Sequence, residues 1–88
     1  MELRHIKYFL AVARTGSIRL ASEELFVAPS AVSRQMTALE EDLGVLLFER
    51  HARGVRLTEA GHHFVERIAA GVDQLDHAVK TAGMAAAG

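Results

Sequence analysis

The polar side chains on the outer face of one predicted helix could bind another polar molecule. Over residues 29–42 these side chains carry hydroxyl or guanidinium groups: Ser30, Ser33, Arg34 and Thr37. A hydroxyl both donates and accepts hydrogen bonds, and a guanidinium presents several N–H donors in one plane. Groups of this kind can read the edges of nucleic-acid bases or hold phosphate oxygens. This helix is therefore the first candidate for a nucleic-acid contact.

The histidines and the acidic run of the chain form no pattern typical of a metal site or an active site. The five histidines are His5, His51, His62, His63 and His77, and no two are four residues apart, as two ligands on one helix face would be. No cysteine is present to supply a thiolate ligand. The acidic residues 40–42 have no nearby nucleophile, so we expect them to form a solvated helix face. We expect a protein that is not an enzyme and that uses no metal and no cofactor.

The composition is that of one small soluble domain. Of the 88 residues, 50% are hydrophobic and 24% are charged, which is too apolar for a disordered chain. The lack of cysteine is compatible with a reducing cytosol. No apolar run approaches the roughly 18 residues of a membrane span, and the N-terminus does not resemble a signal peptide. We therefore expect a cytoplasmic protein with no membrane partner.

The net charge of −1 is unusual for a nucleic-acid-binding protein, because such proteins are often basic. The distribution of the charge is more informative than its sum. Three arginines, Arg50, Arg53 and Arg56, occur between residues 50 and 58 without an acidic residue among them. Positive charge that could meet phosphate groups is thus concentrated in this segment.

Two shorter helices are predicted before the candidate helix. Apolar residues recur at spacings of three and four over residues 3–14, which predicts an amphipathic helix there. Gly16 suits the position just past a helix end, and Ser17 is a favoured N-cap for a second helix over about residues 18–25.

The candidate helix has clear start and stop residues. Pro29 fits the first helical position, where its fixed φ and missing N–H carry no penalty, and Gly44 is expected to end the helix. Its inner stripe is predicted to be Val32, Met36, Leu39 and Leu43.

A β-hairpin is predicted next. Residues 45–48 and 55–57 are apolar or alternating, and the polar residues 51–54 separate them, with Gly54 supplying the turn. Thr58 can then cap a last helix, with Glu59 near the positive end of its dipole.

The last helix carries a heptad pattern. Its apolar positions alternate at spacings of four and three: Gly61, Val65, Ile68, Val72, Leu75, Val79 and Ala82. We expect this stripe to hold two copies of the chain together as a homodimer. Residues 84–88 have no periodic apolar position and are predicted to be a frayed end or the start of a linker.

These elements predict a mainly α fold. It is a winged helix-turn-helix, with a three-helix core and a β-hairpin wing, followed by a long dimerisation helix. We assign residues 1–58 to the DNA-binding domain and residues 59–88 to the dimerisation helix and its frayed end. Spacing alone leaves open a helical pair that packs only for stability.

The whole chain resembles the LysR-type family of bacterial transcription regulators. The matching segments are LRHIKYFLAVA, GSIRLASEEL, AVSRQMTALEEDLGVLLFER and VRLTEAG. The resemblance implies sequence-specific binding of double-stranded DNA at an interrupted palindrome, by a dimer that pairs into tetramers in longer proteins. It also implies antiparallel pairing of the last helices, and a larger domain for a small-molecule coinducer that lies outside this chain. Such a protein would work at the nucleoid.

The resemblance also implies which residues contact DNA. At the start of the candidate helix, which would enter the major groove, they are Pro29, Ser30, Ala31, Ser33, Arg34 and Thr37. Arg53 matches an arginine that the family inserts into the minor groove, where a narrow A·T-rich groove attracts positive charge. Arg19, Arg50 and Arg56 are further candidates for phosphate contacts.

The chain departs from the family pattern at the start of this helix. Many relatives have Ser-Gln-Pro where this chain has Ala28-Pro29-Ser30. A glutamine that could pair with adenine is therefore absent, and so is a hydroxyl N-cap at residue 28. Sequence reading at this point should depend more on Ser30, Ser33 and Arg34, or on DNA shape.

Two other functions remain as alternatives. One is a different winged-helix dimeric repressor, like the multiple-antibiotic-resistance repressors, which place further helices around the core. The other is a protein-interaction module in which the helical pair docks a partner, a reading that the negative net charge favours.

Overall fold

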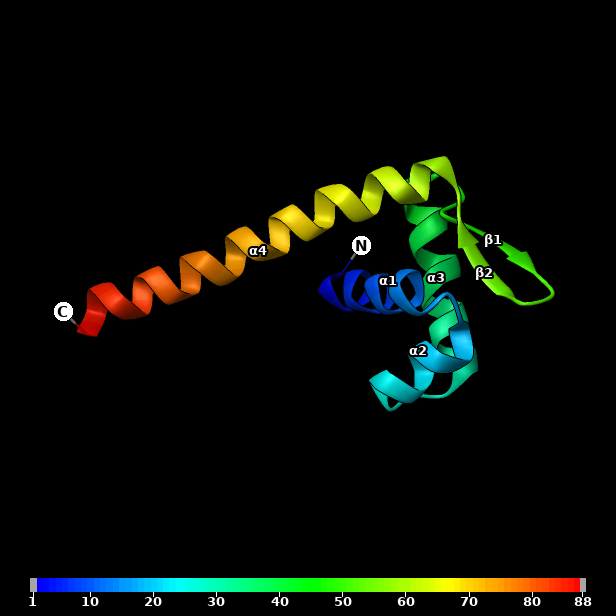
Figure 1. Cartoon of the computed structure of the whole chain (residues 1–88), viewed down its shortest axis with the longest axis horizontal. Helices are drawn as coiled ribbons and strands as arrows, with labels where there is room; N and C mark the ends of the chain where they lie inside the picture. Colours follow the sequence, from blue (N-terminus) through cyan, green and yellow to red (C-terminus); the bar gives the residue numbers. More distant parts are fainter. Residues whose placement is uncertain (1, 88) are drawn as a thin grey trace.

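The computed structural model of the chain describes residues 2–87. The elements follow in the order α1 (Leu3–Thr15), α2 (Ile18–Leu25), α3 (Pro29–Leu43), β1 (Phe48–His51), β2 (Gly54–Leu57) and α4 (Glu59–Ala87). Helices α1, α2 and α3 pack together, the β1–β2 hairpin extends beside α3, and α4 projects far beyond the domain (Figure 1). The predicted winged helix-turn-helix followed by a long helix is confirmed.

The predicted helix ends are formed by the expected caps. The hydroxyl of Ser17 accepts a hydrogen bond from the backbone N–H of Leu20 at 3.1 Å, which caps α2. Gly16 and Gly44 end α1 and α3 in the left-handed conformation, at φ 69° and 71°. At the start of α4, the Thr58 hydroxyl accepts from the N–H of Gly61 at 3.0 Å. The helix ends therefore lie where the capping residues in the sequence predict them.

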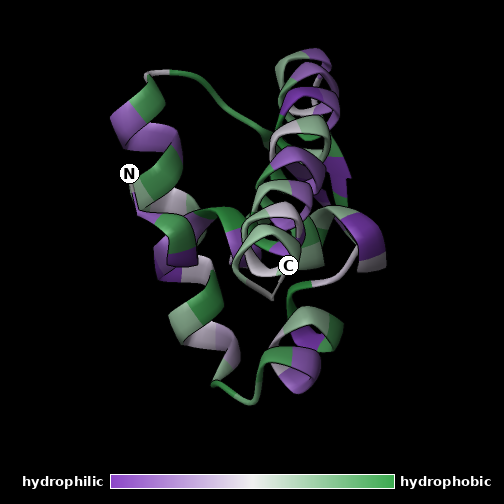
Figure 2. Ribbon diagram, turned by 90° about the vertical axis from the view of Figure 1, so that its left-hand side faces the viewer, coloured by the Kyte–Doolittle hydropathy of each residue, from purple (hydrophilic) through white to green (hydrophobic). Residues whose placement is uncertain are grey.

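The core lies between the three helices and the base of the hairpin. Its buried residues are Phe9, Ala11, Val12, Ala21, Val32, Met36, Leu39 and Leu47. The ring of Phe9 lies 5.2 Å from that of Phe48 on β1 and 5.2 Å from that of Phe64 on α4, measured between centroids. Hydrophobic and hydrophilic residues alternate around the helices, as amphipathic packing requires (Figure 2). The prediction that Leu43 belongs to the buried inner stripe of α3 is wrong, because this residue at the end of the helix is 37% exposed.

The first strand begins later than predicted. The pairing of β1 with β2 runs from Phe48 opposite Leu57 to His51 opposite Gly54, so residues 45–47 are a connection and the turn has two residues. The carboxylate of Glu40 accepts the backbone N–H groups of Leu47 and Phe48, at 2.7 and 3.2 Å. Glu40 thus ties the end of α3 to the wing. Its predicted place on a solvated face is wrong, since those buried amides need an acceptor.

The C-terminal end also differs from its prediction. Residues 84–88 were predicted to be a frayed end or the start of a linker, and helix α4 continues to Ala87, so residues 84–87 are not frayed. Alanine has the highest helix propensity, and residues 85–87 are all alanine, which favours continuation of the helix. Gly88 lies outside the described residues.

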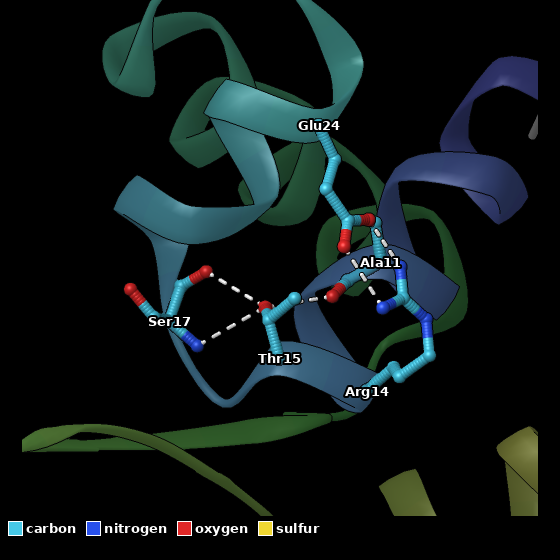
Figure 3. Close-up of polar contacts among 5 residues, drawn as sticks. All are labelled: Ala11, Arg14, Thr15, Ser17 and Glu24. Atoms are coloured by element: carbon cyan, nitrogen blue, oxygen red, sulfur yellow. Dashed lines mark hydrogen bonds and ion pairs between the residues drawn. The ribbon is translucent and has the colours of Figure 1, made fainter.

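Polar contacts fix α1 against α2 (Figure 3). The Arg14 guanidinium forms an ion pair with Glu24 on α2, and the Thr15 hydroxyl donates to the carbonyl of Ser17, the N-cap of α2, at 3.0 Å. The hydrogen bond to Glu24 raises the pKa of Arg14, and the same bond lowers the pKa of Glu24 below its usual value. The pair therefore stabilises the fold at neutral pH, and this contribution is lost as the pH falls through the lowered pKa of Glu24. Because both groups are exposed, the effect is small.

One residue has a backbone conformation that does not suit it. Phe26 ends α2 at φ 57°, and it is the one non-glycine residue with positive φ among residues 2–87. Its side chain is 94% exposed, so no burial of the ring compensates for the conformation. A left-handed backbone costs an ordinary L-residue about 1–2 kcal/mol, and asparagine tolerates it better.

We expect Phe26→Asn to raise the free energy of unfolding by about 0.5–1 kcal/mol, since it relieves this strain and loses no buried contact. In thermal unfolding the midpoint should rise by about 2–8 °C. Phe26→Ala removes the same ring but lacks the carboxamide whose local hydrogen bonds let asparagine tolerate the left-handed conformation, so it should not produce the gain. An asparagine variant no more stable than the alanine variant would show that the backbone here is not strained.

Candidate nucleic-acid interface

The first half of α3 presents a polar surface to solvent. Pro29, Ser30, Arg34 and Thr37 are exposed there, while Ala31 and Ser33 are half-buried at its edge. The opposite face of the helix is buried through Val32, Met36 and Leu39. The candidate residues of α3 thus share one outward face, which the helical period places opposite the core.

Four of the five arginines nominated from the sequence fall into two groups. Arg19 is hydrogen-bonded to Glu23 at 2.8 Å, and Arg56 lies 3.7 Å from Glu49, its neighbour across the hairpin. By contrast, the guanidinium groups of Arg34 and Arg53 make no hydrogen bond or ion pair within residues 2–87. Arg34 lies on α3, and Arg53 lies at the tip of the wing. Of the nominated arginines, these two are the most available to an anionic ligand.

Arg50 connects the two surfaces. Its Nη2 donates a hydrogen bond of 2.7 Å to the Oγ of Ser33, which joins β1 to the outward edge of α3. The residues of the candidate helix and those of the wing are therefore brought together on one side of the domain, where Figure 1 shows the hairpin beside α3.

Sequence reasoning missed the residue that shapes the wing tip. The Nδ1 of His51 accepts the backbone N–H of Arg53 at 3.3 Å. The wing is also attached to the turn before α2, where the Val55 N–H donates to the Gly16 carbonyl at 3.1 Å. The only sign of this contact in the sequence is a histidine two residues before the arginine at the wing tip. That spacing does not by itself predict a hydrogen bond.

The structure divides the heptad stripe of α4 into two parts. Gly61 is buried, and Val65 and Ile68 pack with Phe64 against the core of their own domain. Beyond them Val72 is half-buried, while Leu75 and Val79 are 63% and 72% exposed, and Ala82 is exposed. Among the described residues, the part of the stripe from Leu75 onward is not covered by the chain itself.

The described part of the chain holds neither a metal-binding cluster nor a membrane-spanning helix. Within residues 2–87 no three histidine or acidic side chains lie close enough together to hold a metal ion. No helix in the same range combines the length and the apolar character that crossing a membrane requires.

Comparison with known proteins decides which winged-helix family this is. The profile of the bacterial regulatory helix-turn-helix proteins of the lysR family matches residues 3–62. The chain belongs to the lysR family. The matched segment of this lysR-family chain runs from α1 into the start of α4, and so includes the candidate face of α3 and the whole wing.

Similar proteins are transcription regulators several times longer than this lysR-family chain. The HTH-type transcriptional regulator TcbR of a Pseudomonas species is 53% identical over 66 residues, which cover 75% of this chain and 22% of TcbR. BenM of Acinetobacter baylyi is 42% identical over 78 residues, covering 85% of this chain and 26% of BenM. The chain thus spans about a quarter or less of the length of these relatives.

Solved structures of isolated domains match the lysR-family chain over its whole length. The CbnR DNA-binding domain in complex with DNA has a TM-score of 0.91 and 43% identity, covering 98% of this chain and 99% of that one. The BenM DNA-binding domain with catB site 1 DNA has a TM-score of 0.93 and 39% identity, covering 100% and 99%. Full-length CbnR matches 93% of this chain with 28% of its own length, at a TM-score of 0.86.

Proposed function

We propose that this chain is the DNA-binding part of a LysR-type transcription regulator and binds double-stranded DNA sequence-specifically. The first half of α3 enters the major groove, and Arg53 of the wing enters the minor groove. The observation that carries the proposal is the placement of Arg34 and Arg53 on surfaces that the Arg50–Ser33 hydrogen bond joins. Neither guanidinium has a partner among residues 2–87. The DNA complexes of similar isolated domains support it.

The remaining nominated residues complete this interface. Pro29, Ser30, Ala31 and Thr37 lie along the face of α3 that would contact base edges and phosphates. Arg19 and Arg56 contact phosphates after exchanging their present carboxylate partners, which is feasible because both ion pairs are exposed. In this role the protein is a binding protein and not an enzyme, and it works in the cytoplasm at the nucleoid.

The later half of α4 forms the homodimer. Residues up to Ile68 are engaged with their own domain, so the stripe that begins at Val72 is what a second copy can cover. Antiparallel pairing is favoured, because it lets the two later halves cover one another while the two bulky domains stand at opposite ends. Two recognition helices related by a two-fold axis would then meet successive major grooves about 34 Å apart.

The chain has two functional parts in this proposal. Residues 1–58 contact DNA, and residues 59–88 dimerise. A tetramer and a small-molecule coinducer belong to a longer regulator, and similar proteins have that greater length.

The proposal is tested by Arg34→Ala. We expect specific affinity to fall by about 1–3 kcal/mol if the guanidinium reads a guanine, with relaxed preference at that base pair. The affinities of wild type and variant would be measured by fluorescence anisotropy on a duplex that the wild type enriches from a random library. Equal affinities would place Arg34 outside the interface, and a wild type that enriches no sequence would overturn the proposed function.

The wing is tested by Arg53→Ala on two duplexes that differ only in their flanks. We expect the loss of affinity to be larger with A·T-rich flanks, by roughly 1 kcal/mol, because a narrow minor groove has the more negative potential. The anisotropy measurement would use the same salt for both duplexes, because affinity depends steeply on salt. An equal loss on both duplexes would make Arg53 a phosphate contact.

A further inference from the structure

The tip of the wing is a two-residue turn that carries one side-chain hydrogen bond. His51 ends β1 and pairs with Gly54, the first residue of β2, so Ala52 and Arg53 form the turn. The Nδ1 of His51 accepts the backbone N–H of Arg53 at 3.3 Å. The acceptor lies two residues before the donor, which is the pattern by which asparagine and aspartate side chains hold a turn. His51 therefore acts in this turn as an asparagine would.

The base of the wing is held independently of this bond. The Val55 N–H donates to the Gly16 carbonyl at 3.1 Å. Gly54 lies so close to the same carbonyl that a Cβ would overlap its oxygen, and its φ of 138° also favours glycine. Both turn residues are exposed by contrast, and the bond to His51 is the only side-chain hydrogen bond to them within residues 2–87. The conformation of the tip thus depends on this histidine more than that of the base does.

The bond requires a neutral imidazole. A backbone N–H can only donate, so the Nδ1 of His51 must accept, and the ring proton must lie on Nε2. In a protonated imidazole both nitrogens are donors, so protonation removes the acceptor. Imidazole side chains change charge between about pH 5 and pH 8. Backbone hydrogen bonds do not titrate in that range, so acid should loosen the tip and leave the base of the wing in place.

The charged groups around His51 have partners of their own. Side chains alternate along a strand, so His51 shares a face of the hairpin with Glu49 and with its cross-strand neighbour Arg56. These two side chains lie 3.7 Å apart and pair with each other. Arg50 lies on the opposite face, where it is bonded to α3. The turn before α2, which packs on the base of the wing, has no charged side chain at residues 15–17. Protonation of His51 therefore leaves these pairs intact and acts on the turn itself.

We propose that neutral His51 is a positioning residue for Arg53, and that protonation of His51 weakens the minor-groove contact of the wing. This inference rests on the proposed function. In a turn of two residues, holding the N–H of Arg53 sets the direction in which its side chain leaves the wing. A tip already held in one conformation needs less ordering when DNA binds, and such preorganisation favours binding. The wing should therefore prefer narrow A·T-rich grooves more strongly at neutral pH than in acid.

The test compares affinities for two duplexes that share the site enriched by the wild type from a random library and differ in A·T-rich or G·C-rich flanks. The ratio of the two affinities isolates the wing, because the added charge of a protonated histidine attracts the phosphates of both duplexes alike. We expect the wild-type preference for A·T-rich flanks to fall roughly twofold or more between about pH 7.5 and about pH 5.5. His51→Ala should show the lower preference at both pH values. His51→Asn keeps an acceptor two residues before Arg53 and does not titrate, so it should show the higher preference at both.

Two further variants serve as controls. His77→Ala removes an exposed histidine on α4 and should keep the wild-type pH profile. In an Arg53→Ala background, the flank preference should no longer depend on residue 51. A wild-type flank preference that is absent or independent of pH, or an asparagine variant no better than the alanine variant, would overturn the role of His51 while the proposed function stands. A wild type that enriches no sequence would instead overturn the proposed function.

Discussion

Replacing Leu75 and Val79 with aspartate should give a folded monomer that no longer binds its palindrome specifically. Both side chains are exposed on α4, at 63% and 72%, and belong to the part of the stripe that the chain itself does not cover. A buried unpaired carboxylate is strongly unfavourable, so the charges should prevent a second copy from packing there. Specific binding commonly exceeds non-specific binding by at least roughly 1000-fold, and we expect a loss of about that size.

The measurements are sedimentation for the oligomeric state, circular dichroism for the fold, and anisotropy for affinity. His77→Asp is the matched control, because residue 77 lies on the side of α4 opposite the stripe. That variant should remain a dimer with nearly unchanged affinity. Charges at Val65 or Ile68 would be less informative, because these residues also pack against the core and their replacement would unfold the domain. An aspartate variant that stays dimeric, or a monomer that keeps full affinity, would show that α4 does not assemble the binding unit.

Gly61→Val should separate α4 from the domain or unfold it. A Cβ at residue 61 would overlap the carbonyl oxygen of Leu47 and would lie 2.9 Å from Cδ2 of Leu57. The first of these neighbours is backbone and cannot rotate away, so α4 must shift as a whole. Overpacking of this kind costs about 1–3 kcal/mol and sometimes more. That is a large fraction of the stability of a domain of this size.

Urea unfolding of the variant in the background that carries both Leu75→Asp and Val79→Asp, which is expected to be monomeric, would measure this cost without a contribution from the dimer. Gly71→Ala is the matched control on the same helix, because a Cβ there would meet no atom within 4 Å. The alanine should stabilise α4 by up to about 1 kcal/mol, since glycine is a poor residue inside a helix. A Gly61→Val protein as stable as its parent would mean that α4 does not pack closely on the connection before β1.

The sequence determined the helices and their ends for local reasons. Ser17, Pro29 and Thr58 act at their own positions through hydrogen bonds or a fixed φ, and Gly16 and Gly44 supply the left-handed conformation that ends a helix. Such effects need only neighbours within four residues, so the helices could be predicted to within one residue at most ends. The outward face of α3 followed in the same way, because the helical period separates Arg34 from the buried Met36.

Periodicity also predicted the apolar stripe of α4. It did not show which residues of the stripe pack on their own domain and which remain exposed. A heptad pattern looks the same whether an apolar residue packs on its own domain or on a partner. Only the path of α4 across Phe9 and Leu47 decided that Val65 and Ile68 belong to the domain core and that Leu75 and Val79 are left exposed.

The interface itself was decided by tertiary contacts between distant parts of the chain. Nothing in the local sequence relates Ser33 to Arg50, or the carboxylate of Glu40 to the amides of Leu47 and Phe48. The connection before β1 was predicted to be a strand because it is apolar, yet strand pairing begins only at Phe48. In the fold Leu47 is buried, and its N–H donates to the Glu40 carboxylate. The fold also decides which arginines form an ion pair. An arginine is paired where the folded backbone brings a glutamate close to it, as for Arg19 and Arg56. A single sequence specifies the chemistry of each side chain, and only the fold supplies the distances that turn it into an interaction.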